Sequence, residues 1–201
     1  MDKQRAPLGG AASEGGGPMS HNVVGQSYAL TVLTPIIAGH EIQLRAALRS
    51  LPVGGDSPLA RVPRTHFGRW VIVPQPAFEG PPQRPDPWKS QYLIFTSCFD
   101  GDLDSYLYDL CTLMGDDADR VWSHCVGYPG SAEPAAFARY LRHNQVDTQV
   151  FFAAYPDATV DDVRESLARR DQLLAFVLAT QGVDDLELHH RFREAFGGGR
   201  P

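Results

Sequence analysis

Basic charge is scarce in this sequence, which disfavours nucleic acid and anionic membrane surfaces as partners. The chain has 18 Lys and Arg against 24 Asp and Glu, so its formal net charge is −6. Polynucleotides and acidic lipid headgroups are bound by clusters of positive charge. We therefore expect neither a nucleic-acid partner nor a membrane partner.

Long apolar runs and paired cysteines are also missing. No stretch approaches the roughly 20 apolar residues of a membrane-spanning helix, and the first residues lack the basic-then-apolar pattern of a signal peptide. Cys98, Cys111 and Cys125 form no C-x-x-C pair and have no zinc-ligand spacing. The sequence predicts a cytoplasmic protein with reduced thiols.

The common nucleotide and hydrolase motifs are absent as well. There is no P-loop and no G-x-G-x-x-G, so neither nucleotide nor dinucleotide binding is indicated. No G-x-S-x-G surrounds a serine, which disfavours a hydrolase with a serine nucleophile.

The most informative stretch that is present runs from Tyr92 to Met114. It begins with β-branched and aromatic residues typical of a strand, breaks at Asp100-Gly101, and continues with apolar residues at helical spacing over 103–114. Asp102 and two neighbouring aspartates crowd the helix start, where carboxylates cap free amides. The stretch therefore predicts a strand, an acidic turn and a helix.

The remaining patterns predict one α+β domain over residues 26–197, preceded by a disordered Gly/Ala-rich tail over 1–25. Alternating or aromatic runs predict strands; these cover 28–36, 66–73, 91–98 and 148–155. Apolar residues at helical spacing predict helices; these cover 42–51, 103–114, 133–142, 160–181 and 186–196. Thr159 and Asp162 form a capping pattern before the longest helix.

This order is the ferredoxin-like β-α-β-β-α-β arrangement, with extra C-terminal helices. Four antiparallel strands with helices on one face leave the other face open. A large apolar face is seldom left in water. We therefore expect a homodimer in which two sheets form a dimeric α+β barrel.

Several short motifs resemble a bacterial family of uncharacterised ferredoxin-like proteins over residues 28–180. The motifs are His66-Phe-Gly-Arg-Trp70, Phe99-Asp-Gly-Asp-Leu-Asp-Ser-Tyr106, Gly127-Tyr-Pro129 and Tyr155-Pro156. The architecture is more distantly similar to the dimeric α+β-barrel superfamily, which includes antibiotic-biosynthesis monooxygenases, chlorite dismutases and dye-decolourising peroxidases. The G-x-x-D-G motif of those peroxidases is matched here only at its end, because Ser97 stands where the first glycine belongs. The resemblance implies oxidative chemistry and a possible haem cofactor.

Four polar residues are candidates for catalysis: His66, Arg69, Asp100 and His143. Each has a plainer structural explanation. Asp100 can cap the helix over 103–114, His66 can be a hydrogen-bonded core histidine, and His143 can be a solvated loop residue. Strict alternation along 66–73 places His66 and Arg69 on opposite faces of the strand. Calcium is excluded at the aspartates because Ser105 and Cys111 stand where an EF-hand requires Gly and Glu.

Aromatic side chains supply the candidate substrate contacts, which are Trp70, Tyr106, Phe152 and Tyr155. The sequence thus predicts an enzyme for a small, largely apolar organic molecule in a sheet-face cavity. The resemblance favours a monooxygenase- or peroxidase-type oxidoreductase, with His66 or His143 as base or haem ligand. A cofactor-free rearrangement and a non-catalytic ligand-binding or accessory protein are the alternatives.

Overall fold

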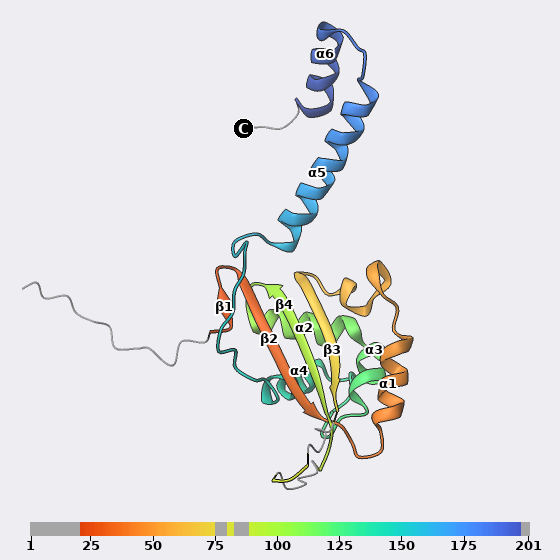
Figure 1. The fold of residues 1–201 in the computed structure, drawn as a ribbon, viewed down its shortest axis with the longest axis vertical. Coiled ribbons are helices and arrows are strands. Elements are labelled where there is room, and N and C mark those ends of the chain that lie inside the picture. Colours follow the sequence, from red (N-terminus) through yellow and green to blue (C-terminus); the bar gives the residue numbers. More distant parts are fainter. Residues whose placement is uncertain (1–20, 75–79, 83–88, 198–201) are drawn as a thin grey trace, which may run out of the picture.

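The computed structural model describes residues 21–74, 80–82 and 89–197. Within them the chain is an α+β protein with one open, four-stranded antiparallel sheet in the order β1-β2-β4-β3 (Figure 1). The strands are β1 (Val23–Val24), β2 (Ser27–Pro35), β3 (Thr65–Val73) and β4 (Tyr92–Asp100). The α+β class and the antiparallel sheet are as predicted.

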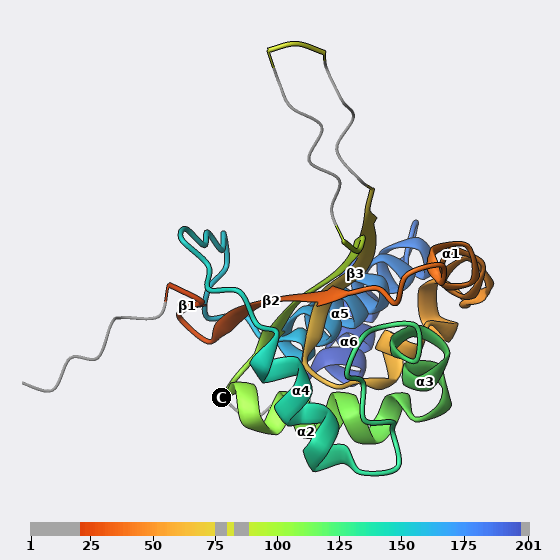
Figure 2. The same cartoon turned by 90° about the horizontal axis from the view of Figure 1, so that it is seen from below.

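One face of the sheet is covered by four helices, and the core lies between the two layers (Figure 2). They are α1 (Glu41–Ser50), α2 (Leu103–Met114), α3 (Asp116–Trp122) and α4 (Pro134–His143), with short 3-10 turns η1 (Gly54–Asp56) and η2 (Pro58–Arg61) beside them. Alternate residues of the strands, such as Leu30 and Phe95, are fully buried under these helices. Trp122 stacks edge-on against Phe95 and Phe137 at ring distances of 5.4 and 5.2 Å.

Helix α2 begins and ends where its sequence pattern predicts. Gly101 has a φ of +89°, which turns the chain sharply out of β4. Asp102 is the N-cap and accepts a 2.8 Å hydrogen bond from the Ser105 amide. The cap is therefore Asp102, and Asp100 is left for another role.

The predicted strand over 148–155 does not form. The position beside β2 is taken by β1, where Val23 pairs with Tyr28, and by a single bridge from Gln145 to Val32. The Thr148 amide consequently donates to the side chain of Asn22 at 2.7 Å instead of joining a ladder. Part of the predicted tail is thus a strand, and residues 1–20 of it lie outside the described residues.

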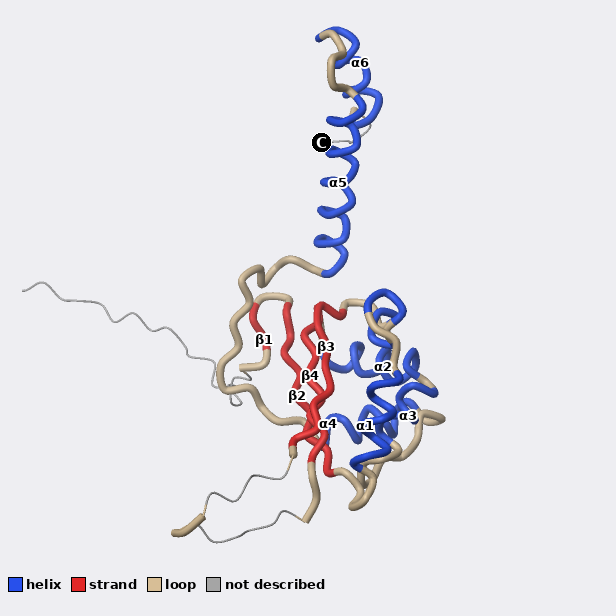
Figure 3. The backbone as a smooth tube through the Cα atoms, turned by 45° about the vertical axis from the view of Figure 1, so that its right-hand side comes forward, coloured by secondary structure: helices blue, strands red, loops and turns tan. Residues whose placement is uncertain are grey.

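The C-terminal helices α5 (Val160–Ala179) and α6 (Asp185–Phe196) form a hairpin that stands away from the sheet (Figures 1 and 3). We call residues 160–196 the arm and residues 21–159 the body. The predicted capping box is confirmed, because Thr159 and Asp162 bond each other's backbone amides. Phe176 joins α5 to α6 through ring contacts of 5.8 Å with Phe192 and 5.3 Å with Phe196. Among the described residues, no helix combines the length and apolarity needed to cross a bilayer.

Candidate functional site

The sheet face opposite α1–α4 is open within the described residues, and two hollows lie on it. One hollow, of about 570 Å³, is lined mainly by β2, β3 and β4 and bordered by the loop after α4, with Phe67, Arg69, Thr96, Cys98 and Phe151 among its residues. The other, of about 550 Å³, lies at the far end of the strands between Leu33, Val73, Lys89, Tyr92 and Ile94. Both are largely apolar, which suits a small organic ligand.

His66 and Asp100 form a bonded pair one step along the strands from the first hollow. The His66 Nε2 lies 2.5 Å from Asp100 Oδ1, and their side chains are only 18% and 6% exposed. The second oxygen of Asp100 accepts the Val160 amide at 2.7 Å. Because a carboxylate only accepts, Nε2 is the donor of this hydrogen bond, and Nδ1 is the ring nitrogen that can take up a proton in the tautomer with its hydrogen on Nε2. Asp100 therefore orients an imidazole and also anchors the first residue of the arm.

A β-bulge at the start of β3 places His66 beside Asp100. The pairing of β3 with β4 shifts between Thr65 and Phe67, so His66 is the extra residue. Arg64, just before it, has a φ of +66° and is held by Asp109 at 2.6 Å. Strict alternation would place the His66 side chain on the core face of β3. The bulge turns it to the open face instead, beside Asp100, as bulges often do near functional sites.

Arg69 is the cation of the first hollow. Its side chain projects from β3 and donates through Nε to the Thr96 hydroxyl at 3.2 Å. Beside it, burial raises the pKa of the Cys98 thiol above its ordinary value, although the charge of Arg69 acts in the opposite direction. Cys98 therefore stays a protonated thiol at neutral pH, and Arg69 supplies the positive charge of this hollow.

Two of the predicted substrate contacts lie on the helix side of the sheet. Trp70 packs on Phe95 and Trp122 at ring distances of 5.3 and 6.0 Å. Tyr106 is fully buried, stacks on Phe99 at 3.7 Å and shares its hydroxyl with Ser97 at 2.6 Å. Neither side chain lines the open face, because Trp70 lies on the core face of β3 beyond the bulge and the apolar stripe of α2 points into the core.

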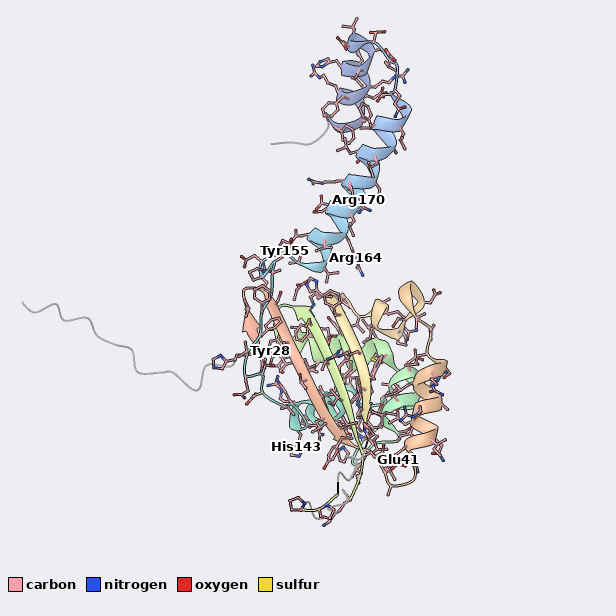
Figure 4. The ribbon with its side chains drawn as sticks, in the orientation of Figure 1. Tyr28, Glu41, His143, Tyr155, Arg164 and Arg170 are labelled. Atoms are coloured by element: carbon pink, nitrogen blue, oxygen red, sulfur yellow. The ribbon has the colours of Figure 1, made fainter. Side chains whose placement is uncertain are left out.

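The other predicted site residues are dispersed. Phe152 and Tyr155 are 83% and 80% exposed on the loop that replaces the expected strand. Figure 4 shows Tyr155 near the root of the arm and His143 towards the opposite end of the body. His143 ends α4, which belongs to the helix layer. The structure thus joins His66 to Asp100, keeps Arg69 on the neighbouring open face, and separates the rest.

The Gly127-Tyr-Pro129 motif has a structural role. The Tyr128 hydroxyl donates to Asp119 at 2.8 Å, and Ser131 donates to the same carboxylate through its amide and its hydroxyl. Burial opposes ionisation of Asp119, yet these hydrogen bonds hold its pKa below the usual range. The motif therefore fastens a turn to α3, away from the open face.

A histidine pair was not predicted. The Nδ1 atoms of His40 and His124 lie 3.2 Å apart, near the end of β2 that is remote from the arm. Burial and the charge of His40 lower the pKa of His124. No group of three His, Cys, Asp or Glu within the described ranges is arranged to hold a metal ion.

The histidine haem ligand implied by the resemblance does not fit the open face. An axial histidine must present a ring nitrogen to the iron. No histidine among the described residues lines either hollow, and His143 belongs to the helix layer. We derive no step through haem.

Comparison with known proteins adds no relative: no family model, no curated protein and no solved structure matches this chain.

Proposed function

We propose that this protein is an enzyme that removes a proton from a small, largely apolar organic molecule bound on the open sheet face, with His66 as the base. The observation that carries the proposal is the hydrogen bond from His66 to the nearly buried Asp100. A carboxylate that fixes an imidazole in one tautomer is the usual way to prepare its other nitrogen as a base.

The neighbouring hollow supplies the other requirements of such a reaction. Its lining binds an apolar body, and Arg69 offers a positive charge to the anion formed when the proton leaves. The guanidinium of Arg69, which also donates to the Thr96 hydroxyl, can form charge-assisted hydrogen bonds to such an anion. Proton removal is the common first step of a cofactor-free rearrangement and of substrate oxidation, so oxidoreductase activity of the monooxygenase or peroxidase type remains a prediction.

The test of this proposal first finds ligands of the protein and then measures whether their C–H protons exchange with solvent. A panel of apolar carbon acids is screened by thermal shift, and the hits are incubated with the protein in D₂O while NMR follows loss of the signal of the acidic C–H group. His66→Gln should lower the exchange rate by about 10²–10⁴-fold, which is the usual contribution of a general base. It should leave ligand binding intact. His143→Gln is the matched control and should exchange at the wild-type rate.

Three outcomes of the same measurements would decide against the proposal or a part of it. Hits that bind wild type but never exchange would identify a non-catalytic ligand-binding protein on the same face. Equal exchange by wild type and His66→Gln would remove His66 from the chemistry. Loss of binding in Arg69→Gln, with exchange retained for any bound fraction, would assign Arg69 to substrate recognition alone.

A further inference from the structure

The arm and the open sheet face are two apolar surfaces without a partner in a single chain. In α5 only Val160 is buried. Val163, Leu167, Leu174, Val177 and Leu178 are between 44% and 70% exposed. On the body, Phe67 and Val71 of the open face are 75% and 41% exposed. Apolar areas of this extent on a folded chain mark sites where protein binds protein.

Five exposed apolar residues of α5 lie on one side of the helix, and we call them the α5 stripe: Val163, Leu167, Leu174, Val177 and Leu178. Their spacings of four, seven, three and one residues keep them within about 100° of one another around the helix. The charged pair Arg170 and Asp171 interrupts the stripe between Leu167 and Leu174. Phe176, which packs against α6, is two residues from Leu174 and so about 200° around the helix from it. Helix α6 therefore covers the far side of α5 and leaves the α5 stripe free.

Helix α5 extends away from the sheet of its own chain. The arm leaves the body where the Val160 amide is bound to Asp100, and its axis runs outward past the end of the strands (Figure 1). The open face of the same chain consequently has no helix on it within the described residues.

We propose that the α5 stripe of one copy docks on the open sheet face of a second copy, and that the two copies exchange arms around a twofold axis. The dimensions agree: the 20 residues of α5 extend about 30 Å, and the 9-residue strands β2, β3 and β4 also extend about 30 Å. A twofold exchange uses both surfaces of both chains, so it closes and leaves none exposed.

The contact area is sufficient for a stable dimer. A helix about 30 Å long and about 10 Å wide covers about 300 Å² of a flat surface. Two such contacts, counted on both partners, bury about 1,200 Å², the lower bound of specific interfaces. The docked arm would also roof the hollow beside Arg69 and remove it from bulk water. The inference needs no catalytic role for His66 and stands apart from the proposed function.

Light scattering and paired charge substitutions test the exchange on the full chain. Wild type should have twice the 22.1 kDa chain mass at micromolar concentration. Leu174→Glu in the α5 stripe and Val71→Glu on the open face should each shift the mass towards one chain. Leu186→Glu is the control, because Leu186 is 75% exposed on α6 and lies outside the stripe; it should stay dimeric. Circular dichroism should show all three variants folded, since the altered side chains lie on the surface.

Mixing the two disrupted variants gives the decisive result. In a mixed dimer the intact arm of the Val71→Glu chain meets the intact sheet of the Leu174→Glu chain, so one native contact is restored. Native mass spectrometry should then detect a heterodimer that neither variant forms with itself.

Three outcomes would overturn the exchange. A monomeric wild type would mean that the arm folds back on its own sheet or stays free. A dimer broken by Val71→Glu and untouched by Leu174→Glu would mean sheet-on-sheet packing. A dimer broken equally by Leu186→Glu would mean that the arm contributes through some other face.

Discussion

The body and the arm contain helices with comparable apolar stripes, yet they use them in opposite ways. Helix α2 has 12 residues and buries five of them. Helix α5 has 20 residues and buries one. Helices in water are stabilised mainly by packing of an apolar face, so α2 is part of a cooperative core, whereas α5 relies on its cap, its hairpin partner and whatever docks on its stripe.

Because of this difference, similar substitutions in the body and in the arm should change the free energy of unfolding by different amounts. A change in the body acts on the folding of the whole domain, because its core is continuous from the sheet to α4. A change in the arm acts on a local segment whose opening need not unfold the body. The predictions below use pairs of variants, one on each side of this division or at its boundary.

The largest effect is expected in the body core. Trp122→Ala removes a fully buried indole that contacts Trp70, Phe95 and Phe137. The cavity should lower the free energy of unfolding by about 3–5 kcal/mol, as measured by urea denaturation. Leu186→Ala on the arm should change it by less than about 0.5 kcal/mol. Equal losses would show that arm and body unfold as one unit, against the division drawn above.

A smaller effect is expected at the junction of the two regions. Asp100→Asn keeps one acceptor for either His66 or the Val160 amide and loses the other, because the amide nitrogen of asparagine cannot accept. A buried group left without its partner costs about 1–3 kcal/mol. Thermal denaturation should show this loss, and hydrogen exchange should show faster exchange at the start of α5. Asp161→Asn, in the same first turn, is the control and should lose less than half as much. A wild-type melt and exchange pattern in Asp100→Asn would mean that this carboxylate does not fasten the arm.

The third effect is confined to the arm. Thr159→Ala removes the side chain that accepts from the Asp162 amide, and loss of such a cap costs about 1 kcal/mol of helix stability. Hydrogen exchange should accelerate in the first turns of α5 while the urea midpoint of the body stays constant. Asp102→Ala is the counterpart in the body: it removes the cap of α2, and the midpoint itself should fall. A shift of the body midpoint in Thr159→Ala would contradict a local role for the arm.

Local sequence patterns predicted most helices and strands of this fold correctly. They did not predict which distant segments pair with each other in the sheet. The strand, turn and helix from Tyr92 to Met114 were correct because each signal there is contained within a few residues. The strand over 148–155 was wrong because the edge of β2 was taken by Val23–Val24 from a segment whose composition indicated only a tail. Competition between two segments for one edge cannot be read from either segment alone.

The candidate site was predicted in its residues and missed in its geometry. His66, Arg69 and Asp100 were selected from the sequence, but alternation placed His66 and Arg69 on opposite faces. A one-residue bulge reverses every inference from alternation on one side of it, and this one depends on the strained Arg64 and its distant partner Asp109. The local sequence around Tyr106 could not show its role either, because its place in the core is set by Phe99 and Ser97 of β4.

The smallest expected effect is on the pH dependence of stability, which should depend on a histidine of the body and not on one of the arm. The pKa of His124 is lowered by burial and by the charge of His40, so the folded protein takes up this proton less readily than the unfolded chain. The stability is therefore full above the unfolded pKa of about 6.5 and falls as the pH drops below it. Thermal melting at pH 7.5 and at pH 5 should show this loss in wild type, and His124→Gln should show a smaller one. His190→Gln on α6, an exposed arm residue, should retain the wild-type difference. If His124→Gln kept the full difference, the acid sensitivity would belong to other groups and the pair would be a packing contact only.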